Sequence, residues 1–166
     1  MDKDRFLRVF KESLEVITEK RFFSSELGYQ GQLVSELNKR LIMELVFSSR
    51  AVVEQEYQKR LKRHGIRIRP DIIIHVPYSE GIHSSRKEDN YVVIQLKKNS
   101  SKKDALDDFK KIDLLFQNLD YPLGVFLNID SEKNFYSDYL GEYRDRIHCF
   151  AVRLSAEDKV IIHKSP

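Results

Sequence analysis

Two apolar stretches in the middle of the chain decide the fold: Arg69-Pro-Asp-Ile-Ile-Ile-His75 and Tyr91-Val-Val-Ile-Gln-Leu-Lys-Lys98. Both are rich in β-branched residues, which favour strands. Residues 77–90, between them, are polar and have no apolar period, which predicts a loop. We therefore expect two strands within residues 66–76 and 91–97, and we take them as neighbours in one sheet.

Helical patterns surround this pair of strands. Residues 102–119 carry apolar side chains at helical spacing after the break at Asn99-Ser-Ser101, which predicts a helix that packs on the sheet. The remaining expected elements are helices at 4–18 and 26–47, strands at 51–60, 125–129, 146–154 and 159–163, and a turn at 62–65. This order predicts one α/β (α+β) domain over residues 1–166 with a mixed sheet.

Composition bounds the class of protein. The chain has 166 residues, of which 41% are hydrophobic and 33% charged, as expected for a soluble globular domain. We find no apolar run long enough to span a membrane and no apolar signal-peptide core after Met1. The single cysteine, Cys149, excludes an internal disulfide, so a cytoplasmic setting is expected. Phosphate-binding loops, Gly-x-Gly-x-x-Gly and Gly-x-Ser-x-Gly are absent from the sequence.

The charge is unevenly distributed along the chain. The formal net charge is only +3, yet residues 57–103 hold 12 basic and 4 acidic residues. The flanking segments, 1–56 and 104–166, are both net acidic. A concentrated basic segment is typical of proteins that bind a polyanion, although it also fits a solvated basic surface.

The basic segment contains a group of residues suited to phosphodiester chemistry. Gln95 and Lys97 lie two residues apart on one predicted strand, so their side chains point the same way. Asp71 opens the other strand and, in an antiparallel pair, would lie beside Gln95. Asp71, Gln95 and the Leu96 carbonyl could supply the hard oxygen ligands that Mg²⁺ prefers, with Mn²⁺ as a substitute. Lys97 could orient or deprotonate a water, or stabilise charge on the phosphate.

These residues resemble the PD-(D/E)xK nuclease superfamily, which has the restriction-endonuclease-like fold. Pro70-Asp71 matches the first half-motif and Gln95-Leu-Lys97 the second, over a core at about residues 25–130. The resemblance implies an αβββαβ core and Mg²⁺-dependent cleavage of DNA by in-line attack of water. The N-terminal helix and the C-terminal strands would be additions to that core.

Gln95 departs from the commonest pattern, which has an acid at that position. Mrr-type restriction endonucleases resemble this variant, with Gln-x-Lys in the same place. The amide removes one negative charge from the metal site and should weaken cation binding. It is equally consistent with an inactive domain or with an introduced Glu→Gln change.

The superfamily often adds an acid from the preceding helix. Glu26 is the preferred candidate, Glu36 is second and Glu44 third. Capping the first helical turn is an equally good reason for an acid at Glu26. The residues expected to contact nucleic-acid phosphates are Arg60, Lys62, Arg63, Arg67, Arg69, Lys98, Lys102 and Lys103.

Three hypotheses for function follow. The first is a metal-dependent deoxyribonuclease with Asp71, Gln95, Lys97 and Glu26 in its active site, with RNA as a less favoured substrate. The second is a domain of the same fold that has lost catalysis and binds nucleic acid or a protein partner. The third is an interaction subunit in which these residues are structural. A homodimer or a partner subunit is expected by analogy with related nucleases.

Overall fold

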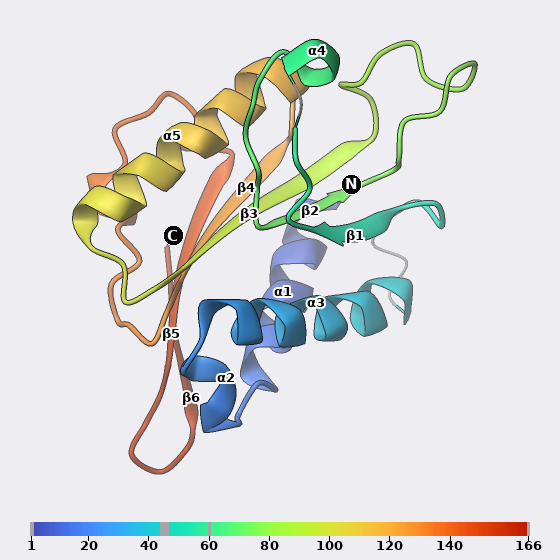
Figure 1. Ribbon diagram of the computed structural model, residues 1–166. Coiled ribbons are helices and arrows are strands. Elements are labelled where there is room, and N and C mark those ends of the chain that lie inside the picture. The colour runs from blue at the N-terminus through green and yellow to red at the C-terminus, as the bar shows by residue number, and fades with distance from the viewer. Residues whose placement is uncertain (1, 44–46, 60, 166) are drawn as a thin grey trace.

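The computed structural model describes residues 2–43, 47–59 and 61–165. Six strands form one mixed sheet in the order β1-β2-β3-β4-β5-β6 (Figure 1). The strands are β1 (Val52–Gln55), β2 (Ile72–His75), β3 (Asn90–Lys98), β4 (Leu123–Ile129), β5 (Ile147–Leu154) and β6 (Val160–Lys164). The β3–β4 and β4–β5 pairs are parallel, and the other three pairs are antiparallel.

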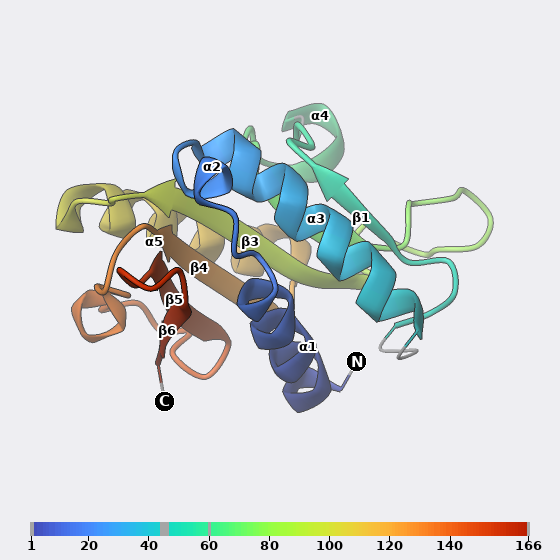
Figure 2. The ribbon, with the colours of Figure 1, turned by 90° about the horizontal axis from the view of Figure 1, so that it is seen from below.

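Helices cover both faces of the sheet. They are α1 (Lys3–Glu15), α2 (Lys20–Phe23), α3 (Glu26–Met43), α4 (Leu61–His64) and α5 (Lys102–Leu119), and a 3₁₀ turn spans Tyr136–Asp138. Figure 2 looks onto the face that carries α1 and α3, with α5 behind the sheet. The order α3, β1, β2, β3, α5, β4 is the expected αβββαβ core, so the predicted fold class is confirmed.

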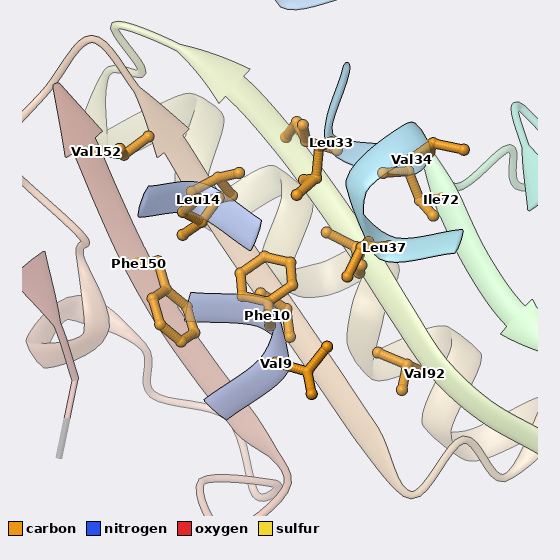
Figure 3. Packing of buried hydrophobic residues seen from close by; sticks show 14 of the residues in the cluster. Val9, Phe10, Leu14, Leu33, Val34, Leu37, Ile72, Val92, Phe150 and Val152 are labelled. Carbon is orange, nitrogen blue, oxygen red and sulfur yellow. The ribbon is translucent and has the colours of Figure 1, made fainter. Parts of the chain in front are cut away.

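Each face of the sheet has its own apolar core. On one face, Phe10 and Leu14 of α1 and Leu33 and Leu37 of α3 pack on the strands, including Phe150 of β5 (Figure 3). The other core lies between the sheet and α5 and includes Cys149, whose thiol is buried. Two helix layers therefore enclose the central strands, which explains why β2 and β4 are buried along their whole length.

The helix α5 has the predicted bounds because its start is defined locally. The Ser101 side chain accepts a hydrogen bond from the Asp104 amide, and the Asp104 side chain accepts one from the Ser101 amide. The helix lies very close to β4 at Gly124, where a Cβ would come within 2.6 Å of the Ile112 side chain. A larger residue there would push α5 away from the sheet.

Several predicted bounds are wrong. Within the range 66–76, only Ile72–His75 forms a strand, because Ile66 packs into the α5 core from the segment after α4 without pairing with another strand. The turn expected at 62–65 belongs largely to the short helix α4, which ends before Gly65 at φ +73°. Among the described residues, no helix is both long and apolar enough to cross a membrane.

Candidate active site

The candidate site lies where β3 extends beyond the start of β2. Ile72, the first residue of β2, pairs with Ile94, whereas β3 continues to Lys98. From Gln95 onward, β3 is paired with β4 on one side and has no partner from β2 on the other. Asp71 immediately precedes β2 and therefore lies at this open edge of β3.

The Asp71 carboxylate is attached to the second half-motif. The Leu96 N–H donates a 2.7 Å hydrogen bond to Asp71 Oδ2. The backbone carbonyl of Asp71 accepts hydrogen bonds from Gln30 Nε2 at 3.0 Å and from the Glu56 N–H at 2.9 Å. Within the described part of the chain, nothing donates to the other carboxylate oxygen, Oδ1. Three hydrogen bonds thus fix Asp71, two at its backbone carbonyl and one at its carboxylate, and Oδ1 is left for a ligand.

Burial makes the Asp71 carboxylate unusually basic. Desolvation raises its pKa from 3.8 to about 6, and the nearby carboxylates of Asp108 and Glu26 add to that increase. The Leu96 N–H and the Lys97 ammonium act in the opposite direction. The protein therefore keeps a negative charge here at a cost, which is typical of functional sites.

Gln95 lies beside Asp71, as predicted, and is 1% exposed. Its neighbours Ile94 and Leu96 belong to the core under α1 and α3, whereas Val93 faces α5, so Gln95 points toward α5. Among the described residues, its amide nitrogen has no hydrogen-bond acceptor. Because an amide can be turned end for end, this unpartnered group fits a ligand that binds through the Gln95 carbonyl oxygen.

The Leu96 carbonyl faces the same edge. The N–H and C=O groups of one strand residue point to the same side, and the Leu96 N–H points at Asp71. The three predicted oxygen ligands are consequently neighbours. They include only one carboxylate, and no group of three or more His, Cys, Asp or Glu suited to a metal occurs in the described residues.

Glu26 reaches this site from the first turn of α3. Its Oε1 accepts a 3.3 Å hydrogen bond from Lys97 Nζ, and its Oε2 accepts a 3.1 Å bond from the Lys98 N–H. Burial would lower the pKa of the Lys97 ammonium, but the carboxylates of Asp108, Glu26 and Asp71 outweigh it and raise that pKa. Lys97 is therefore kept as a cation by its contact with Glu26 of α3 and by the nearby charges of Asp108 on α5 and Asp71 before β2.

The other two helix acids do not join this group in the described part of the chain. Glu36 bonds to Gln32 and Lys39 on its own helix. Glu44 lies outside the described residues. Glu26, the preferred candidate among the helix acids, contacts Lys97 of the second half-motif.

Sequence reasoning missed Asp108 on α5. This residue is 1% exposed, its Oδ1 accepts a 2.6 Å bond from Lys111, and its Oδ2 has no donor among the described residues. Burial raises the pKa of its carboxyl, while Lys111 and Lys97 act in the opposite direction. The available signal was an acid in phase with the apolar side chains of Ala105 and Ile112.

The predicted phosphate-binding residues divide into three groups. Lys62, Arg67 and Lys103 are exposed and have no carboxylate partner among the described residues. Arg69, Lys98 and Lys102 are paired with Glu56, Asp130 and Asp138, at 2.8, 3.8 and 2.6 Å. Arg60 and the Arg63 side chain lie outside the described part of the chain.

Solved structures that are similar to this chain include two of NucC. NucC from E. coli MS115-1, in a cAAA-bound form, has a TM-score of 0.49 at 11% identity, and the match covers 99% of this chain and 84% of that one. NucC from P. aeruginosa ATCC27853, also cAAA-bound, has a TM-score of 0.41 at 12% identity, with 99% and 85% covered. No protein-family model and no curated protein matches the sequence. These likenesses are too distant to indicate a function, so the site geometry has to support one.

Proposed function

We propose that this protein is a Mg²⁺-dependent nuclease that hydrolyses phosphodiester bonds in DNA. One observation carries the proposal: Asp71 is bonded to the Leu96 amide at an open strand edge, next to Gln95 and to a Lys97 that Glu26 holds. A half-buried carboxylate whose pKa is raised to about 6, beside a lysine held as a cation, destabilises the fold at neutral pH, and a role in phosphate chemistry would explain why it is present.

The metal ligands would be Asp71 Oδ1, the Gln95 side-chain oxygen and the Leu96 carbonyl. Asp71 and the Leu96 carbonyl lie at the open edge of β3, and the neighbouring Gln95 points its side chain toward α5. A bound Mg²⁺ would polarise the scissile phosphate and lower the pKa of a coordinated water. Ionised Asp71 contributes the negative charge of this ligand set. The Leu96 N–H bond orients its carboxylate, so little reorganisation is needed when a cation arrives.

Lys97 would act mainly as a cation. Its pKa lies above the ordinary lysine value, so at neutral pH it carries a proton and suits the charge that develops on the attacked phosphate. To remove a proton from water, Lys97 would first have to lose its own proton, and the surrounding carboxylates oppose that loss. Glu26 would position the ammonium, and Asp108 would support its charge from the α5 side.

The charge distribution supports a nucleic-acid substrate. Exposed Lys62, Arg67 and Lys103 have no carboxylate partner in the described residues, so they are available to contact phosphates. DNA is the substrate class that we propose, and RNA is compared with it below. A second copy of the chain or a partner subunit would supply the second active site needed to cut both strands.

A second candidate function is a domain that binds nucleic acid or a protein partner without cleaving. Gln95 favours it, because this neutral, buried side chain leaves Asp71 as the single carboxylate of the proposed ligand set. This alternative predicts binding through the basic residues without any need for a metal.

A cleavage assay with matched variants tests the proposal. Supercoiled plasmid, linear duplex DNA, single-stranded DNA and RNA are each incubated with the protein in Mg²⁺, in Mn²⁺ and in EDTA. Asp71→Asn and Lys97→Met are compared with the exposed controls Asp107→Asn and Lys110→Met, which disrupt an ion pair on the outer face of α5. Retained folding is checked for each variant by circular dichroism.

We expect metal-dependent DNA cleavage that falls at least about 100-fold in Asp71→Asn and in Lys97→Met and is unchanged in both controls. Cleavage of RNA alone would correct the substrate class. Metal-independent binding without cleavage, unaffected by either site variant, would favour the second candidate.

A further inference from the structure

A second polar cavity lies at the other end of β2 from the candidate active site. It has a volume of about 200 Å³, and the charged and imidazole groups that line it include those of Glu54, Lys59, His75, Arg86 and Glu88. Asp71 precedes β2 and His75 ends it, so the two sites are about 13 Å apart along the strand. Figure 1 shows the surrounding elements: α4, β1 and the loop that leads from β2 to β3.

The Lys59 ammonium is the most unusual group in this cavity. The residue is 2% exposed, and its Nζ donates a 3.1 Å hydrogen bond to the Tyr121 hydroxyl. The ammonium also lies 4.5 Å from the centre of the Tyr57 ring. No described carboxylate lies within 4.0 Å of it, although a buried lysine usually has a paired acid. One neutral hydroxyl leaves two of its three protons for another acceptor.

Arg86 brings a second cation to the same cavity. Its guanidinium lies 4.1 Å from the centre of the Tyr78 ring and has no carboxylate partner among the described residues. The two acids of the cavity are already engaged. Glu54 bonds to His75 at 2.7 Å, and Glu88 accepts hydrogen bonds from the amide and hydroxyl of Ser84. Two cations therefore face one small space, and neither is in contact with a carboxylate.

This arrangement has an electrostatic cost without a ligand. Burial lowers the pKa of the Lys59 ammonium to about 8; Glu54 acts against that decrease, and Arg86 adds to it. If Lys59 served only to fill space, an apolar side chain of the same size would stabilise the fold at least as well. An anion between Lys59 and Arg86 would convert their mutual repulsion into two charge-assisted contacts.

We propose that this cavity binds a small phosphate-bearing ligand, either free phosphate or a phosphomonoester, between Lys59 and Arg86. A phosphate dianion has the charge to match two cations on different sides of one cavity. Its oxygens can accept hydrogen bonds from the Arg86 guanidinium and from the two remaining protons of the Lys59 ammonium. A phosphate of duplex DNA fits less well, because the Lys59 ammonium is buried and a DNA backbone cannot enter a space of about 200 Å³. The inference is independent of the proposed nuclease activity.

Calorimetric titration of the full chain tests it, with inorganic phosphate and 5′-AMP as probes and succinate as a dianion that lacks phosphorus. The variants are Lys59→Met, which keeps the length of the buried side chain, and Arg86→Gln in the loop. Lys87→Gln is the matched control, since Lys87 is exposed in the same loop and does not line the cavity. Duplex DNA binding is measured in parallel.

We expect saturable one-to-one binding of at least one phosphate probe, weakened about tenfold or more by each cavity variant and unchanged by Lys87→Gln. Stronger binding of 5′-AMP than of phosphate would indicate a phosphomonoester, and the reverse would indicate free phosphate. If Lys59→Met does not fold, Arg86→Gln decides the question alone.

Three results would overturn the proposal. One is an absence of phosphate binding up to 10 mM, roughly the limit of useful affinity for a small site. Another is a failure of specificity, in which the wild type and both cavity variants bind equally or succinate binds more tightly than either phosphate probe. The third is a loss of DNA binding in both cavity variants without any binding of the small probes, which would assign these cations to nucleic acid.

Discussion

The amide of Leu96 donates a 2.7 Å hydrogen bond to Asp71 Oδ2, so the two half-motifs are joined directly, although 25 residues separate them in the chain. The contact forms because β2 starts one residue after Asp71 while β3 continues past it. If β2 began one residue earlier, Asp71 would pair with Gln95; instead its side chain bonds to the backbone of β3.

Asp71→Asn should reduce cleavage at least about 100-fold and leave the fold at neutral pH as stable as the wild type or more stable. A carboxyl whose pKa rises from 3.8 in the unfolded chain to about 6 in the fold stabilises the fold below pH 4. That contribution, on the order of 3 kcal/mol, is lost as pH rises through about 6. The asparagine can still accept the Leu96 hydrogen bond.

Urea denaturation of both proteins from pH 4 to pH 8 measures this effect. The difference in unfolding free energy should increase in favour of Asp71→Asn between pH 4 and 6 and then remain constant. A variant that is less stable than the wild type at pH 7.5 would show that the Asp71 charge has a structural role.

Cleavage should depend on the ionisation of Asp71. At low Mg²⁺ concentration we expect kcat/KM to rise with pH through about 6, since the protonated carboxyl cannot bind a cation. Saturating Mg²⁺ should move this midpoint to lower pH, because a bound cation favours the carboxylate. A midpoint that does not respond to the Mg²⁺ concentration would separate Asp71 from the metal.

Gln95→Glu tests how much the neutral amide weakens Mg²⁺ binding at the proposed site. An added carboxylate beside Asp71 should lower the Mg²⁺ concentration needed for half-maximal cleavage by about tenfold, since it adds a charged oxygen ligand to the site. We expect the maximal rate to change less than the metal dependence. Titration of cleavage against Mg²⁺ measures both quantities. An inactive wild type that becomes active through this substitution would identify the natural chain as a degenerate nuclease.

Asp108→Asn should lower the pKa of Lys97 and reduce cleavage by about tenfold or more, as loss of a supporting carboxylate typically does. Among the carboxylates, Asp108 contributes most to the raised Lys97 pKa. The pKa of the Lys97 ammonium can be measured by NMR. If Asp108 had only a structural role, its replacement would leave that pKa unchanged. Asp107→Asn, one residue away on the exposed side of α5, is the control.

Local signals explain why parts of the fold were predictable. The helix 102–119 has a capping serine and an uninterrupted apolar stripe, and both bounds are correct. The pairing of Asp71 with Gln95 followed from strand alternation and from the two apolar runs. Ile66 and Ile68 misled the assignment of β2, since β-branched residues that pack on α5 from a loop have the same pattern as a strand.

The charged groups at helix and loop positions were less predictable. Nothing in the sequence near Asp108 distinguishes it from the exposed acids of α5 except its phase with the stripe. Lys59 falls in a segment predicted as a strand, and its burial depends on Tyr57 and on Tyr121, which lies 62 residues away. Long-range contacts of this kind decide which ionisable groups lose water, and one sequence does not reveal them.

The end of β3 that lacks a partner from β2 has a consequence for solubility. An open strand edge attracts strands from other chains unless it is blocked. Here the Asp71 carboxylate accepts the hydrogen bond of the Leu96 amide, and the Glu26 carboxylate accepts that of the Lys98 amide. The residues proposed to cut phosphodiesters would thus also prevent edge-to-edge association of this sheet, so replacing them all together should make the protein aggregate as well as inactivate it.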